Sequence, residues 1–407
     1  MAQLDIRVET PPRRQAGPAQ LALLLAGSCL AVLGAVLIAP VLPKMEDHFA
    51  GVAGADVLVP IVLTIPALVI GLTAPFAGVV IDAIDRKRLL IVALLVYAVA
   101  GTAPLYLGSL GAIIASRAVV GLCEAAIMTC CTTLIADYWS GPERSRYLGL
   151  QTLVATIAAT VFLALGGALG AAGWRTPFWV YLIALALVVP MARMLWQPAS
   201  GSGRSSGSGR TPLPPIPWRQ LLVPCLFTLV GGTVFYALVV QLSFVLDNLG
   251  VSSSAAIGGV SAAMSVATAA GSASFAKLSG QRPRTLLPLA FGLAALGLVL
   301  VWLAGNVAMV TLGAMVTGAG TGLLLPVMLT WATNRLRFEE RGRGTGLWTG
   351  FLFVGEFASP LLVAAFKAGT GGLQPALGVL GVVAAVLAIL ALLVVPRSSA
   401  PLNVTSE

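Results

Sequence analysis

Residues 117–146 read RAVVGLCEAAIMTCCTTLIADYWSGPERSR, and the rest of the chain is organised around this stretch. It begins inside a long apolar segment that contains the charged residues Arg117 and Glu124. A charged side chain in the core of a bilayer costs at least about 2.5 kcal/mol, so such residues normally face a bundle interior or a watery cavity. The segment from Asp137 to Arg146 is polar, and we expect it to be a loop.

The end of this stretch recurs later in the chain. Residues 143–152 (ERSRYLGLQT) match residues 340–349 (ERGRGTGLWT) at six of ten positions, with an offset of 197. The same offset places Gly121 on Gly318. The sequence therefore predicts two halves that are diverged copies of one another.

Composition places the chain in a membrane. Of the 407 residues 58% are hydrophobic and 10% are charged, whereas soluble domains carry roughly 25% charged residues. Continuous apolar runs of about 20 residues span a bilayer as helices. We count twelve such runs, and because they do not alternate in polarity we expect helices and no barrel. The predicted fold is all-α, with twelve transmembrane helices in two pseudo-symmetric six-helix bundles.

The basic residues are distributed unevenly along the predicted spans. Of the 24 Lys and Arg residues, 20 fall on one side, three on the other and one, Arg117, within a helix. This bias follows the positive-inside rule, so both termini are expected in the cytoplasm and the protein in the inner (plasma) membrane. The net charge of +9 is thereby explained without nucleic acid.

Shifts in composition divide the chain. We expect a cytoplasmic tail (1–19), a first bundle (20–196), a Gly/Ser/Pro-rich linker (197–218), a second bundle (219–396) and a second tail (397–407). The first apolar run is long enough to span the membrane, so we interpret it as a retained helix. The single histidine and the five cysteines in apolar runs indicate neither a metal site nor a disulfide framework. No enzyme activity, cofactor or metal is expected, and we expect a monomer.

These features resemble the major facilitator superfamily of secondary transporters. The turn after the second span contains Gly78, Asp82 and the basic trio Arg86, Lys87 and Arg88, which is similar to the family signature G-x-L-A-D-R-x-G-R-R-K. Arg117 and Gly121 match the family's R-x-x-x-G element. The resemblance implies alternating access to one small-molecule site near the bilayer midplane, between the two halves.

Glu124 and Glu356 lie near the middle of their spans and are the candidates for proton coupling. Burial favours the neutral form of a carboxylic acid, so either group can carry a proton. The alternative for each is a protonated or paired glutamate that only holds helices together. Substrate contacts are expected from Arg117, Gln241 and Tyr236, although Arg117 can instead be paired within the bundle. Further aromatic or polar residues at possible cavity positions are Phe235, Trp331, Asn334 and Trp348.

The charged residues of the turns resemble the family's cytoplasmic gate. Their ion pairs would form when the cytoplasmic side closes and break when it opens. The alternative is an ordinary solvated turn. The candidate gate residues are Gly78, Asp82, Arg86, Arg88, Asp137, Glu143 and Arg144.

Two functions are expected from this constellation, and a third is kept as a contrast. The first is proton-coupled export of small amphipathic or cationic solutes. The second is import of a small organic anion together with protons, with Arg117 holding the carboxylate. The third, a membrane sensor that does not transport, would need no acids at the midplane.

Overall fold

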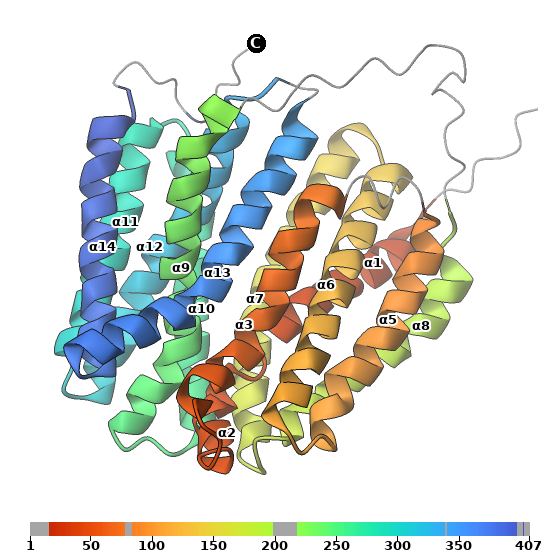
Figure 1. Cartoon of the computed structure of the whole chain (residues 1–407). Coiled ribbons are helices and arrows are strands. Elements are labelled where there is room, and N and C mark those ends of the chain that lie inside the picture. Colours follow the sequence, from red (N-terminus) through yellow and green to blue (C-terminus); the bar gives the residue numbers. More distant parts are fainter. Residues whose placement is uncertain (1–15, 78–83, 198–217, 338–339, 397–401, 403–407) are drawn as a thin grey trace, which may run out of the picture.

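The computed structural model describes residues 16–77, 84–197, 218–337, 340–396 and Leu402. Within this part of the chain every regular element is a helix, and twelve helical spans are long and apolar enough to cross a membrane. The predicted all-α fold with twelve spans is therefore confirmed. Figure 1 shows the spans as two groups side by side, with α1–α8 in one group and α9–α14 in the other.

The helices have the following bounds. The first group consists of α1 (Pro18–Val36), η1 (Ala39–Val41), α2 (Leu42–His48), α3 (Ala55–Thr73), η2 (Ala74–Phe76), α5 (Arg86–Thr102), η3 (Ala103–Leu105), α6 (Leu110–Tyr138), α7 (Gly141–Gly170), η4 (Thr176–Leu182) and α8 (Ile183–Met194). The second group consists of α9 (Trp218–Asn248), α10 (Ser254–Leu278), α11 (Pro283–Leu303), α12 (Val307–Thr333), α13 (Arg341–Thr370) and α14 (Leu373–Val394). The domain boundaries expected at the tails and the linker stay a prediction.

The polar segment between α6 and α7 differs from our expectation. Only Trp139 and Ser140 separate the two helices, so most of the expected loop is helical. Polar composition was the wrong criterion, because the first turn of α7 contains residues that favour a helix start. Pro142 has a preset φ that suits this position, and the carboxylate of Glu143 is favoured by the positive end of the helix dipole.

The sequence repeat has a structural counterpart in helix packing. Gly121 of α6 faces the backbone of α3 at Pro66, where a Cβ would lie 2.6 Å from the Cα of Pro66. Gly318 of α12 faces α10, where a Cβ would lie 2.7 Å from the carbonyl oxygen of Met264. Each half therefore packs its fourth span on its second span through an equivalent glycine, Gly121 in the first half and Gly318 in the second.

We call the end of the molecule where α8 ends and α9 begins the linker side, and the opposite end, which contains α2, the α2 side (Figure 1). The halves contact each other closely on both sides. On the linker side, a Cβ at Gly71 of α3 would lie 3.1 Å from the carbonyl oxygen of Gly350 in α13. On the α2 side, a Cβ at Gly258 of α10 would lie 2.8 Å from the Cα of Gly167 in α7. Small residues let these helices approach.

Candidate functional site

A cavity of about 490 Å³ lies between the two halves. It is reached by α1, α3, α6 and α7 of the first half and by α9, α10, α12 and α13 of the second. Most of its wall is apolar, and two carboxylic acids line it, Glu124 from α6 and Glu356 from α13. Among the described residues that line this central cavity, none is Lys, Arg or His. The structure therefore brings together, in one chamber, the two acids that the sequence singled out.

Glu124 is buried against α1. Its side chain is 1% exposed, and its Oε1 atom has no hydrogen-bond partner within the described part of the chain. The same atom lies against the Cα of Gly34, in the space that a Cβ of residue 34 would occupy. A buried carboxyl oxygen without a partner is costly in its charged form, so Glu124 is suited to hold a proton.

Arg117 lies in the interior of the first half. The side chain is fully buried. Its Nε donates to the carbonyl oxygen of Val62 at 3.3 Å, its Nη1 to the Tyr181 hydroxyl at 2.5 Å and its Nη2 to the carbonyl oxygen of Gly34 at 2.8 Å. Arg117 is not among the residues that line the central cavity. Its donor groups thus tie α1, α3 and η4 to α6.

Tyr236 connects the two halves. It lies on α9 and lines the central cavity, and its hydroxyl donates to the carbonyl oxygen of Ala35 in α1. Two consecutive residues of α1 thereby contact functional candidates: Gly34 contacts Arg117 and Glu124, and Ala35 contacts Tyr236. Sequence reasoning missed Gly34, because a glycine in an apolar run has no side chain to mark it.

The other predicted site residues lie in three places: the central cavity, a second cavity and the core of the second half. Glu356 is 5% exposed, and its carboxyl group makes no hydrogen bond with another described residue. Gln241 lines a different cavity, on the α2 side. Of the further aromatic candidates Phe235 and Trp348 line the central cavity, whereas Trp331 is buried in the core of the second half.

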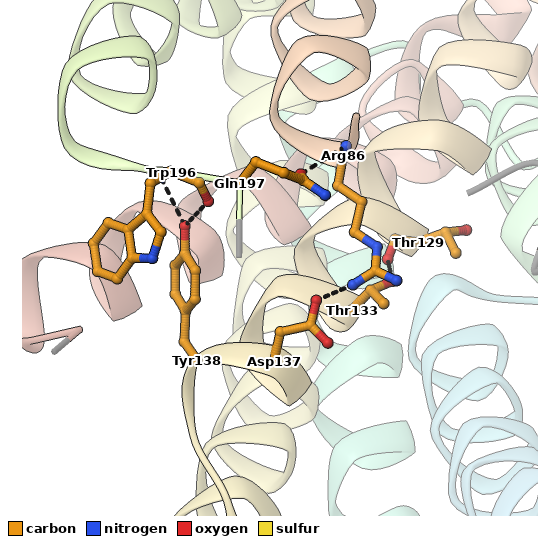
Figure 2. Close-up of polar contacts among 7 residues, drawn as sticks. All are labelled: Arg86, Thr129, Thr133, Asp137, Tyr138, Trp196 and Gln197. Carbon is orange, nitrogen blue, oxygen red and sulfur yellow. Dashed lines mark hydrogen bonds and ion pairs between the residues drawn. The ribbon is translucent and has the colours of Figure 1, made fainter. Parts of the chain in front are cut away.

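The charged turns of the linker side are shown in part in Figure 2. Arg86 at the start of α5 forms an ion pair with Asp137 at the end of α6, and its backbone N–H donates to Gln197 at 3.0 Å. Next to them the Tyr138 hydroxyl donates to the carbonyl oxygen of Trp196 at 2.6 Å. These contacts join elements of the first half only.

The remaining gate candidates do not join this group. Arg88 contacts Asp85, with its Nε 3.7 Å from the carboxylate. Glu143 and Arg144 are exposed in the first turn of α7, and neither forms an ion pair with another described residue. Gly78 and Asp82 lie outside the described residues. The gate therefore stays a prediction.

Across the described chain, no group of His, Cys, Asp and Glu is arranged to hold a metal ion.

Twelve apolar spans in two packed halves, with an acid-lined cavity between them, define a multi-pass membrane protein with a central cavity. The chain belongs to the Major Facilitator Superfamily, whose family model matches residues 24–282 and 222–407. The resemblance stated from the sequence is thereby confirmed, and the chain is a multi-pass membrane protein of a transporter family.

Individual relatives are distant. The chain is 30% identical over 172 residues to Multidrug resistance protein 2 of Bacillus subtilis and 27% identical over 172 residues to the uncharacterized MFS-type transporter YdgK of the same organism. Each match covers 41% of this chain, and 40% and 42% of the two relatives respectively.

Solved structures match over nearly the whole chain. A bacterial homolog of the human lysosomal transporter Spinster, in an inward-facing and unoccupied conformation, superimposes with a TM-score of 0.74 at 17% identity, covering 92% of this chain and 97% of that one. A mutant of the peptide transporter POT in complex with alafosfalin has a TM-score of 0.74 at 14% identity, covering 94% and 96%. At these identities the likeness concerns the fold alone.

Proposed function

We propose that the protein is a secondary transporter that works by alternating access and exports small amphipathic or cationic solutes in exchange for protons. The observation that carries this proposal is the charge of the central cavity. One acid from each half lines it, the rest of the wall is largely apolar, and none of its described lining residues is basic. A solute with an apolar body and a positive charge complements such a wall.

The two close contacts between the halves support alternating access. The α3–α13 contact lies on the linker side and the α7–α10 contact on the α2 side, with the central cavity between them. If the halves rock about the cavity, opening one side breaks one contact and keeps the other. A solute or a proton that binds the two states unequally then shifts their populations.

Glu124 is the acid through which protonation would reach the helices. A charge on its carboxyl group, which lies against Gly34, would favour a movement of α1 that exposes the group to water. Ala35, the next residue of α1, accepts the hydrogen bond of Tyr236 from the other half. Proton release from Glu124 would therefore weaken a contact between the halves. Glu356 would be a second carboxylate in the same cavity and could bind the proton or the solute in place of Glu124.

Import of an organic anion has less support. The donor groups of Arg117 already bind Gly34, Val62 and Tyr181, and the side chain does not line the central cavity. An anionic solute there would face Glu124 and Glu356. The name of Multidrug resistance protein 2 also favours export over import for this chain.

We further propose that the linker side faces the cytoplasm of the cell and that the Arg86–Asp137 pair belongs to its gate.

Transport in proteoliposomes tests the proposal. With the membrane potential clamped and the interior made acidic, an antiporter accumulates tetraphenylphosphonium in either orientation, whereas a proton symporter expels its solute. Glu124→Gln and Glu356→Gln should each abolish uphill accumulation but retain part of the exchange of labelled for unlabelled cation. Glu124→Asp and Glu356→Asp, which keep a carboxylate, are the controls. Full gradient-driven accumulation by both Gln variants would remove the proton-coupling assignment.

A further inference from the structure

A second cavity, of about 510 Å³, lies between the halves on the α2 side. The first half lines it with Pro43, Glu46, Asp47, Asp56 and Val57, from α2 and the start of α3. The second half lines it with the end of α9, the end of α13 and the start of α14. We call it the α2-side cavity. The proposed function makes no use of it.

Acidic residues dominate the charge of the α2-side cavity. Glu46, Asp47, Asp56 and Asp247 line it, together with one cation, Lys367. In the described part of the chain none of these carboxylates lies within ion-pair distance of a base. Four negative charges and one positive charge leave an uncompensated negative field in a concave space, and such a field concentrates cations.

Gln241 points independently to a ligand. Its side chain is 6% exposed and lines the α2-side cavity, yet its amide makes no hydrogen bond with any other described residue. Its amide atoms are not among the fully buried ones, so they reach the cavity surface. A ligand in the cavity, or its hydration water, can therefore form the hydrogen bonds that the protein leaves open. Gln241 was expected from the sequence to contact a solute, and the structure places it away from the central cavity.

The residues that line the α2-side cavity indicate which kind of cation it can bind. The described carboxylates are not grouped closely enough to hold a metal ion. Apolar side chains share the wall with them, among them Phe244, Pro360 and Val363. A cation with an apolar body uses both parts of this wall, whereas a compact metal ion uses neither well.

The two cavities are distinct but lie one behind the other along the same helices. On α9 Tyr236 lines the central cavity, and Gln241 lines the α2-side cavity. On α13 the corresponding residues are Glu356 and Pro360. These spacings amount to roughly 6–8 Å along a helix. The hydrogen bond from Tyr236 to Ala35 joins the halves at the level of the central cavity.

We propose that the α2-side cavity is a second binding site for amphipathic organic cations, held between the halves by the carboxylates of α2, α3 and α9. The class of ligand rests on the proposed function, but binding there does not require transport. The ammonium group of Lys367 would compete with a bound cation for these carboxylates.

Binding of tetraphenylphosphonium to the purified full-length protein in uncharged detergent tests this site. Equilibrium dialysis should find two sites per chain. The double variant Asp56→Asn/Asp247→Asn should weaken one site about ten-fold, since a charge about 6 Å from a bound cation contributes roughly three-fold in water. Lys367→Met should strengthen the same site about three-fold, and higher salt should weaken it. Glu356→Gln should weaken the other site more than this one, because Glu356 lines only the central cavity.

The outcomes separate the two proposals. One site in the wild type that responds only to Glu356→Gln would overturn the second site and leave the proposed function intact. An isotherm that neither the Asp variant nor Lys367→Met changes would also overturn it. Conversely, responses to these two variants without any effect of Glu356→Gln or any driven transport would support the second site while the proposed function fails. Because Lys367→Met acts in the opposite direction, a gain in affinity cannot be attributed to poor folding.

Discussion

At the scale of single residues, Gly34 is the point where the two ionisable side chains of α6 meet α1. Arg117 donates to its carbonyl oxygen, and the Glu124 carboxyl group lies against its Cα. A side chain at position 34 would occupy the space of that carboxyl group. The backbone of Gly34 is helical and would accept any residue. Glycine is required here because the Glu124 carboxyl group approaches so closely.

Gly34→Ala should displace Glu124 and destabilise the protein by about 1–3 kcal/mol, the usual cost of overpacking a tight interior. The cost should be smaller in a Glu124→Ala background, because the colliding carboxyl group is gone. Thermal unfolding of the four proteins of this cycle measures the coupling. Gly27→Ala in the same helix is the matched control, since its Cβ would meet Cys131 and Met191 and not Glu124, so its cost should not depend on Glu124. Equal costs with and without Glu124 would contradict the contact.

Tyr236→Phe should loosen the contact between the halves, because it removes the hydroxyl that bonds Ala35. Tyr97→Phe is a close control, since the Tyr97 hydroxyl donates to the carbonyl oxygen of Leu30 at 2.7 Å within the first half. Each change should cost about 1 kcal/mol. Hydrogen exchange should rise at the end of α1 and in α9 together only for Tyr236→Phe. The same pattern in both variants would show that the Tyr236 bond does not join the halves.

At the scale of helices, α6 is the element that holds the first half together. Through Arg117 it binds the backbone of α1 and α3 and the hydroxyl of Tyr181 in η4. Through Gly121 it packs directly on α3. A charged residue in an apolar span is therefore compensated by backbone acceptors of neighbouring helices.

Arg117→Lys should destabilise the protein by at least about 2 kcal/mol, because an ammonium group lacks the planar fork of donors and leaves buried acceptors unpaired. Arg175→Lys is the control for loss of a guanidinium, since Arg175 binds the carbonyl oxygens of Pro104 and Leu107 at a less buried position. Thermal unfolding should show the larger loss for Arg117. If Arg117→Lys kept its stability but lost binding of a carboxylate solute, Arg117 would be a substrate residue after all.

At the scale of the whole molecule, the two glycine contacts divide the interface by side. Gly71 meets Gly350 on the linker side, and Gly258 meets Gly167 on the α2 side. Larger side chains at the two positions should therefore bias the molecule in opposite directions.

Gly71→Val should separate the halves on the linker side, and Gly258→Val on the α2 side. Spin labels at Ile84 and Gln281 report on the linker side, and labels at Val52 and Ser252 on the α2 side, in a background without the five native cysteines. Electron–electron distance measurements should show an increase at one pair for each variant. An increase at the same pair in both variants would contradict rocking about the central cavity.

Binding of a permanent cation should depend on pH. Protonation of Glu124 and Glu356 removes the charge that attracts tetraphenylphosphonium, so its affinity should fall as the pH is lowered. The dependence should become shallower in Glu356→Gln, which carries one titrating group fewer. Titrations between pH 5 and pH 8 measure it, and an unchanged slope in both Gln variants would exclude these acids as the titrating groups.

The twelve spans, the repeat that pairs Gly121 with Gly318 and an acid in the middle of two spans can all be predicted from the sequence, because apolar length and the cost of charge in lipid are local properties. Which neighbours these residues meet depends on how the helices pack. Tyr236 and Gln241 are five residues apart on one helix and line different cavities, and Arg117 is satisfied by carbonyl groups of α1 and α3. Helical periodicity fixes the face of a residue, whereas the packing of whole helices fixes what that face touches.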